Sequence, residues 1–285
     1  MKRLLALALA SLMLCSVRAI TYETEDSVRV VALLREGAKQ SANVNLMLFY
    51  AHQLEGTPYV AATLEVNKTE QLVVNLRQLD CTTLVENVAA LTLTTRQGSA
   101  RWQDFCHWLT MLRYRRGRMD GYLSRNHYFS QWVCSGVEQG LLLEPKATPA
   151  GNYWPFCGVQ QTDLHFMSAH PDAYPMLGRD PQTLEQLRAA EQETAGDSVR
   201  YIPSHLLNRS HEALKYVQDG DILALVTSRD GLDVSHLGLA QWLDGRLHML
   251  HASSQHGRVL LDPQPLFEYM QKRTSLLGIR VVRVK

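Results

Sequence analysis

The sequence predicts an α+β fold in which a mainly helical part precedes a β-rich part. From about residue 41 to residue 120, apolar residues recur at the three- and four-residue spacing of amphipathic helices. From Asp221 onward, short apolar or alternating runs are separated by turn signals, which is typical of strands. The 285 residues, 46% of them hydrophobic, suffice for one elaborated domain with a real core.

The first 19 residues are expected to be a secretory signal peptide rather than part of the fold. The stretch "MKRLLALALASLMLCSVRA" has a basic tip, an apolar run from Leu4 to Leu14 and a cleavage site after Ala19. A lipoprotein site at Cys15 is the alternative, but such sites need a small residue before the cysteine. The apolar run is too short to span a bilayer comfortably. We therefore expect an exported protein, periplasmic or secreted, without stable membrane insertion.

The remaining chain divides into an N-terminal extension at residues 20–45 and a single domain at residues 46–285. Within this domain, residues 120–211 are rich in Pro, Gly, Asn and aromatic residues and predict a loop-rich insertion. Such loops often shape a binding cleft, and a surface insertion without a role is the alternative. The net charge of +1 gives no indication of a nucleic-acid partner.

The stretch "RQLDCTTLVENVAALT" places Cys81 directly after Asp80, a residue type that caps helix N-termini. Cys81 is therefore expected at the first helical position, with Leu84 and Val88 on the same face. Unpaired N–H groups and the helix dipole stabilise a thiolate there, so Cys81 is a candidate nucleophile. A buried structural cysteine is the alternative.

A disulfide is the other alternative for Cys81, because an oxidising compartment permits disulfides. Three further cysteines follow the expected signal peptide: Cys106, Cys134 and Cys157. The sequence does not indicate which of the four cysteines would pair. No Cys/His spacing typical of a zinc site is present, so no metal site is predicted.

The last part of the chain contains five strand-like runs. They are Asp221–Thr227, His236–Leu243, Arg246–Ser253, Arg258–Asp262 and Gly278–Val284.

Asp244-Gly245 between the second and third runs is a strong signal for a two-residue hairpin. In that register Leu243 pairs with Arg246, and His236 lies diagonally across from His251 on one sheet face. His248 then points to the opposite face. The hairpin thus predicts a pair of histidines, His236 and His251.

Several motifs in order resemble the NlpC-type papain-like cell-wall hydrolases. "EGTPYVAATLE" and "LDCTTLVENV" are similar to the Gly-x-Pro-Tyr and Asp-Cys-x-x-Leu-Val elements of that superfamily, and "QDGDILAL", "SHLGLA" and "LHASS" follow in the same order. More narrowly, "NHYFSQW", "YIPSHLL" and "GLDVSHLGLA" resemble its N-acetylmuramoyl-L-alanine amidase-like branch. The similarity runs from about Leu46 to the C-terminus.

The resemblance implies a helix bundle packed on a small antiparallel β-barrel, with a cleft between them. It also implies that Cys81 is the nucleophile, His236 the general base and His251 the residue that orients the imidazole. Tyr59 matches the tyrosine that lines the site and helps to form the oxyanion hole. The superfamily usually has Ser-Gly after the cysteine, whereas Thr82 follows here and would alter the substrate pocket.

Two residues just before His236 are further candidates, because they lie at the cleft rim if the strand begins where we place it. Asp233 and Ser235 could contact substrate there, and turn formation explains "RDGLD" equally well.

The resemblance implies an exported cysteine amidase that cuts the amide between N-acetylmuramic acid and L-alanine in muropeptides, without a metal or organic cofactor. One alternative is a D-glutamyl–diaminoacid endopeptidase of the same superfamily. Others are a zinc amidase on another fold and a non-catalytic muropeptide-binding protein in which Cys81 forms a disulfide.

Overall fold

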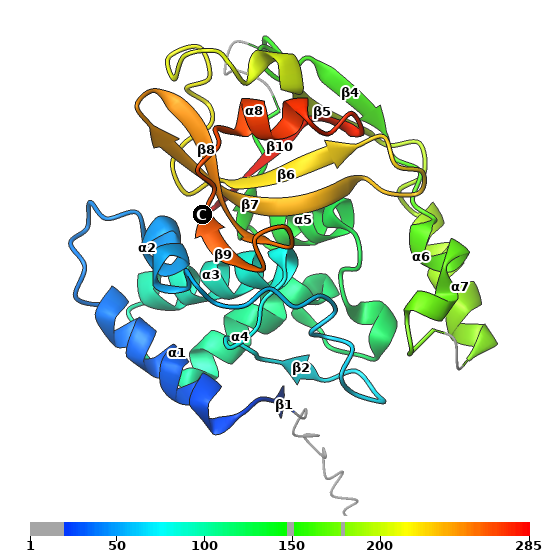
Figure 1. Ribbon diagram of the computed structural model, residues 1–285. Coiled ribbons are helices and arrows are strands. Elements are labelled where there is room, and N and C mark those ends of the chain that lie inside the picture. The colour runs from blue at the N-terminus through cyan, green and yellow to red at the C-terminus, as the bar shows by residue number, and fades with distance from the viewer. Residues whose placement is uncertain (1–19, 147–150, 178–179) are drawn as a thin grey trace, which may run out of the picture.

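The computed structural model describes residues 20–146, 151–177 and 180–285, so the expected signal peptide at residues 1–19 lies outside the described residues. Helices gather on one side of a large antiparallel sheet, and a shorter helical segment covers part of the other side (Figure 1). The predicted α+β fold is confirmed. Within the described residues, no helix is long and apolar enough to cross a membrane.

The helical layer is built around one buried helix, α3. The helices are α1 (Thr24–Gly37), α2 (Leu46–Gln53), α3 (Cys81–Arg96), α4 (Trp102–Arg113), α5 (Phe129–Glu138), α6 (Phe166–Ala169), α7 (Pro181–Gln192) and α8 (Leu266–Gln271), with 3-10 turns at Arg115–Gly117, Tyr122–Ser124, Pro171–Ala173 and Ser204–Leu206. Every α3 residue from Thr83 to Thr94 is buried. A helix that is buried on all sides needs partners all round, and α3 contacts α1, α2, α4 and two strands of the sheet.

The strands form one large sheet and one small parallel pair. The pair is β1 (Ile20–Thr21) with β2 (Leu72–Val73). The sheet contains β3 (Leu142–Leu143), β4 (Gly158–Gln161), β5 (Ser198–Pro203), β6 (Ile222–Thr227), β7 (Val234–Leu243), β8 (Arg246–Ser253), β9 (Arg258–Leu261) and β10 (Leu276–Val284). Its order is β4-β5-β10-β6-β7-β8-β9, with β3 beside the end of β10. All five predicted strands are present.

The expected closed barrel is wrong, because the sheet is open. Its two end strands, β4 and β9, do not pair with each other in the described part of the chain. The outer edge of β9 is instead occupied by the segment that precedes Tyr59. Val259 donates its N–H to the carbonyl of Thr57, and Gly56 donates to the carbonyl of Val259. This segment caps the edge that a barrel would need for closure.

Alternation along the strands divides the apolar residues between two cores. On β7 and β8, Leu237, Leu239 and Leu250 face the helical layer. Leu247 and Met249 face the other way and pack in a second core with α8. Because side chains alternate across a strand, His236 and His251 lie on the α8 side of the sheet while Leu237 faces α3. Strand β7 therefore packs on the helical layer with one face and carries His236 on the other face.

Residues 20–45 contain a helix that packs in the main core. Val30 and Leu34 of α1 are fully buried against the helical layer. Asp26, also buried, accepts a hydrogen bond from the backbone N–H of Leu76 at 2.9 Å and pairs with Arg77. This contact ties α1 to the segment that leads into α3.

Residues 120–211 combine loops with ordered elements. β4 and β5 extend the main sheet, and the N-terminal half of α5 is buried. A separate small core joins α6 and α7 to Tyr128, which precedes α5. The hydroxyl of Tyr128 donates to Glu191 of α7 at 2.6 Å.

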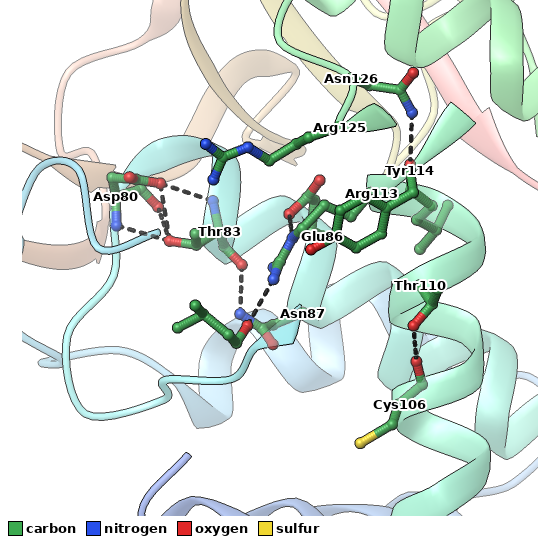
Figure 2. Close-up of polar contacts among 12 residues, drawn as sticks. Asp80, Thr83, Glu86, Asn87, Cys106, Thr110, Arg113, Tyr114, Arg125 and Asn126 are labelled. Atoms are coloured by element: carbon green, nitrogen blue, oxygen red, sulfur yellow. Dashed lines mark hydrogen bonds and ion pairs between the residues drawn. The ribbon is translucent and has the colours of Figure 1, made fainter. Parts of the chain in front are cut away.

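A buried ion pair connects α3 to α4. Arg113 donates from Nε to Oε2 of Glu86 at 2.7 Å, and both side chains are almost completely buried. Arg113 also donates to the carbonyl of Val73, and Arg125 approaches from the segment before α5 (Figure 2). A buried charge costs a great deal of free energy unless it is paired. Loss of either partner alone would therefore leave an uncompensated charge buried between α3 and α4.

Replacing only one partner of this pair should destabilise the fold strongly. In Arg113→Met, the Glu86 carboxylate loses its buried cation, and we expect the free energy of unfolding to fall by about 3–5 kcal/mol. The double variant Glu86→Leu with Arg113→Met removes both charges and should recover much of that loss. Urea unfolding followed by circular dichroism measures both. A double variant that is no more stable than Arg113→Met would contradict this account.

Candidate active site

The site begins at the first turn of α3. Asp80 is the N-cap, and its side chain accepts from the N–H of Thr83 at 2.8 Å, while the Thr83 hydroxyl accepts from the N–H of Asp80 at 2.9 Å (Figure 2). This reciprocal capping box fixes where the helix starts. Cys81 is the first helical residue, as predicted. Cys81 is half-buried, and its thiol is not part of a disulfide.

The β7–β8 hairpin brings the two predicted histidines together. Leu243 pairs with Arg246, and the predicted register continues without a slip to Leu239 and Leu250. Asp244 and Gly245 both have positive φ, which a type I′ turn requires. Nε2 of His236 lies 2.6 Å from Nδ1 of His251. His248, on the opposite face as predicted, bonds to the carbonyl of Asp262.

A buried aspartate, which the sequence reasoning missed, continues this chain of side chains. Oδ2 of Asp262 lies 3.3 Å from Nε2 of His251, and both side chains are buried. Asp262 comes from the end of the β8–β9 hairpin, where Ser253 pairs with Arg258 across a four-residue loop. The pairing rule used for β7–β8 would have placed Asp262 diagonally across from His251, so a signal existed.

One cleft is lined by Cys81 together with most of the predicted site residues. It also contains Thr82, Asp233, Ser235 and His236. Thr82 and Ser235 are exposed, so their hydroxyls are accessible from solvent.

Asp233 is engaged inside the protein. One oxygen of its carboxylate accepts from the N–H of Ser130 at 2.6 Å, in the first turn of α5, and the other accepts from the N–H of Val234. These bonds show a structural role for Asp233 in joining α5 to the start of β7.

Tyr59 also lies near Cys81, and it comes from the segment between α2 and β2. The segment around Tyr59 bridges to Leu79, just before the α3 cap, and its N–H donates to the carbonyl of Gly257. Burial raises the pKa of Tyr59, and the electrostatic effects of Cys81 and Asp80 raise it further. The phenol therefore keeps its proton and is able to donate a hydrogen bond.

The rest of the cleft wall combines aromatic side chains with polar atoms. Tyr128, Phe129 and Trp132 line it from α5 and the residue before it. The indole N–H of Trp132 and the side-chain oxygen of Asn126 are buried, and neither has a hydrogen-bond partner. These four residues belong to the motif "NHYFSQW", which carries the resemblance to the amidase-like branch, but the sequence analysis assigned none of them to the site.

The electrostatics favour a neutral thiol beside a neutral imidazole. Burial, followed by the neighbouring Asp80 carboxylate, raises the pKa of Cys81 to about 11, against hydrogen bonds from the Leu237 backbone and from Thr82. Burial, followed by the electrostatic effects of His251 and Arg273, lowers the pKa of His236 to about 3. At neutral pH the two groups are uncharged, and the arrangement suits a base that takes the thiol proton only during attack.

The residues that the structure describes contain no group of three or more His, Cys, Asp or Glu side chains placed to hold a metal ion. All four cysteines of the described chain, which include Cys106, Cys134 and Cys157, are free thiols. The cleft itself offers a thiol, an imidazole whose second nitrogen is hydrogen-bonded, and hydrogen-bond donors at a helix N-terminus.

The fold and the site define a mixed α+β protein with a cysteine and a histidine in one cleft. Residues 50–279 match the AmiA-like family, described as N-acetylmuramoyl-L-alanine amidase-like. The chain belongs to this family. A search of curated proteins found no match.

Solved structures with the same fold agree with this assignment. An N-acetylmuramoyl-L-alanine amidase from Bacteroides uniformis is 35% identical, with a TM-score of 0.77 over 88% of this chain and 99% of that chain. A protein from Bacteroides fragilis, proposed to be a xylanase, is 41% identical, with a TM-score of 0.76 over 83% and 100%. A Legionella pneumophila protein is 21% identical, with a TM-score of 0.69 over 91% and 94%, and shares the fold.

The pKa of Cys81 leads to a prediction about thiol reactivity. Because the thiolate is the reactive form, alkylation of Cys81 by iodoacetamide should be slow at pH 7 and should accelerate about tenfold per pH unit up to pH 10. Peptide mass spectrometry separates Cys81 from the other cysteines. The control is His236→Ala, which should leave this profile unchanged. A fast plateau at neutral pH that disappears in His236→Ala would instead reveal a preformed thiolate–imidazolium pair.

Proposed function

We propose that the protein is a cysteine amidase of the papain-like NlpC type, which hydrolyses the amide between N-acetylmuramic acid and L-alanine in muropeptides. The observation that carries this proposal is one cleft lined by Cys81 at a helix N-terminus and by His236, whose second ring nitrogen is held by His251. The amidase-like family and the amidase from Bacteroides uniformis support the bond type.

The hydrogen-bond chain sets the tautomer of the base. The Asp262 carboxylate only accepts, so Nε2 of His251 carries a proton and its Nδ1 is an acceptor. Nε2 of His236 must then donate to that Nδ1. This leaves Nδ1 of His236 as a lone pair, which is the form that a general base requires. Asp262 thereby acts on the base through His251, as a positioning residue.

The proposed reaction has two halves. In the first, Nδ1 of His236 takes the proton from Cys81 while the sulfur attacks the amide carbonyl, and the imidazolium then protonates the leaving amine. In the second, His236 activates water to hydrolyse the thioester. The charge on His236 during each half is stabilised through His251 by the buried Asp262 carboxylate.

The oxyanion of each tetrahedral intermediate needs hydrogen-bond donors. The backbone N–H of Cys81, at the first position of α3, lacks an intrahelical acceptor. We assign the phenol of Tyr59 as a second donor, since its raised pKa keeps the proton in place. One such donor typically lowers the barrier by about 3–4 kcal/mol.

The cleft does not favour glycoside hydrolysis, although one neighbour is proposed to be a xylanase. That chemistry commonly uses two carboxyl groups flanking the glycosidic bond. The two acids that line the cleft are Glu86 and Asp233. Glu86 is paired with Arg113, and Asp233 accepts backbone N–H groups. Both are held in structural interactions.

The substrate and location follow from this proposal. Peptidoglycan fragments are the proposed partner, and the proposed reaction uses no cofactor. The basic and apolar segment at residues 1–19 would direct export to the periplasm or the medium. Thr82 and Ser235 carry the exposed hydroxyls best placed to contact substrate. Asp233 lines the cleft, and its carboxylate holds the start of β7 against α5.

A digestion of purified muropeptides tests the reaction. The native protein should release intact stem peptides with a free L-alanine amine, and Cys81→Ala should release none, with products identified by mass spectrometry. Thr82→Ser is a matched control that keeps a hydroxyl beside the cysteine. Products cut after D-glutamate would identify the endopeptidase instead. An inactive native protein that still binds muropeptides would identify a binding protein.

The positioning role of Asp262 gives a second test. In Asp262→Asn, the side-chain oxygen can keep the hydrogen bond from the N–H of Gln264, and the amide NH₂ then faces His251. Both imidazoles would have to change tautomer, and Nδ1 of His236 would lose its lone pair. We expect kcat to fall about 100-fold or more with an altered pH profile, as for other misoriented triads. Unchanged kcat in a variant with native melting temperature would refute the role.

A further inference from the structure

A second cavity borders the proposed base, His236. It is lined by His236 and His251, by Ser235, and by Arg273 and Tyr269 from α8 and the turn that follows it. Ser235 and His236 line both this cavity and the Cys81 cleft. Cys81 lines only the first. The two cavities thus share Ser235 and His236 as a common wall.

Arg273 is held in a fixed position in this second cavity. Its Nη1 donates to the carbonyl of Tyr269 at 2.6 Å, and its Nη2 donates to Oε1 of Gln255 at 2.7 Å. The guanidinium also lies 3.7 Å from the centroid of the Tyr269 ring. A guanidinium has five N–H donors, so these two bonds hold the side chain and leave donors for a ligand.

The charge of Arg273 is not balanced inside the protein. No carboxylate of the described residues lies within ion-pair distance of it, whereas other arginines near the sheet, such as Arg280 and Arg283, have acidic partners. Arg273 therefore presents an ordered cation, flanked by serine hydroxyls, beside the proposed base.

The proposed chemistry decides which half of the substrate each cavity holds. The acyl half stays attached to Cys81 in the thioester, so it belongs in the cleft that contains Cys81. The leaving amine receives its proton from Nδ1 of His236, and the peptide attached to this amine can extend past Ser235 and His236, which line both cavities. The cavity that borders His236 but not Cys81 therefore holds the peptide half of the substrate.

We propose that this second cavity is a subsite for the stem peptide, in which Arg273 binds a free carboxylate close to the scissile amide. This inference rests on the proposed amidase function. In stem peptides the residue after L-alanine is a γ-linked D-glutamate, whose α-carboxylate is free unless it is amidated. A planar guanidinium recognises a carboxylate through paired hydrogen bonds and recognises the amide less well. The subsite thus selects stem peptides with the free carboxylate.

Two substrates that differ only in this group test the subsite. They are N-acetylmuramoyl-L-alanyl-D-glutamate and N-acetylmuramoyl-L-alanyl-D-isoglutamine, compared by kcat/KM. The native protein should prefer the carboxylate about tenfold or more, as expected for a hydrogen-bonded charge. Arg273→Gln should lose this preference by slowing only the carboxylate substrate, and Arg273→Lys should keep part of it. Lys272→Gln is the matched control, because it removes an exposed neighbouring charge and should keep the full preference.

Several results would overturn the inference. Equal cleavage of both substrates by the native protein would do so. So would an equal loss on both substrates in Arg273→Gln, because that loss would show that Arg273 acts only through the field at His236. If the native protein cleaves neither substrate, binding of both to Cys81→Ala by calorimetry decides the matter. A carboxylate preference that depends on Arg273 would keep the subsite and discard the amidase, and its absence would discard both.

Discussion

The capping of α3 is the interaction on which the rest of the site depends. Asp80 and Thr83 bond each other's backbone N–H groups, so the helix can start only at Cys81. Because α3 is then buried along most of its length between the helices and the sheet, its first turn cannot shift along the strand β7. The thiol is therefore held beside the backbone of Leu237, next to His236 in the chain. A surface helix with the same cap would not fix the sulfur relative to the sheet.

Burial of α3 fixes the position of the Cys81 thiol. Burial also opposes ionisation of the thiol and of the His236 imidazole. The same low-polarity surroundings raise the pKa of Cys81 and lower that of His236, so neither group is charged at rest. Asp262 offsets part of this cost, because its charge raises the pKa of His251 against the effect of burial. The Asp262 carboxylate thus lies at the far end of the hydrogen-bonded chain His236–His251–Asp262. In the proposed reaction, a charge in that position would stabilise a protonated imidazole without repelling a developing thiolate.

Local signals in the sequence were sufficient for the parts of the site that depend on neighbouring residues. The Asp80–Cys81 start and the Asp244-Gly245 turn each predicted a geometry that the structure confirms. Contacts between distant segments were not predictable in this way. The edge of β9 is covered by residues around Thr57, some 200 positions earlier, and no periodicity indicates that an open sheet follows. Asp262 lies between these cases, since a four-residue hairpin loop has a less certain register than a two-residue one.

The two cavities also relate substrate binding to the strength of the base. Burial lowers the pKa of His236 most, and His251 and the positive field of Arg273 lower it further; Arg273 lies on the side assigned to the peptide half. A carboxylate bound to Arg273 would cancel part of that field, and by linkage the imidazole would then accept a proton more readily. The unpaired cation would therefore add to the effect of burial, which keeps His236 a weak base in the empty site. The correct substrate would strengthen the base at the point where the thiol proton must move.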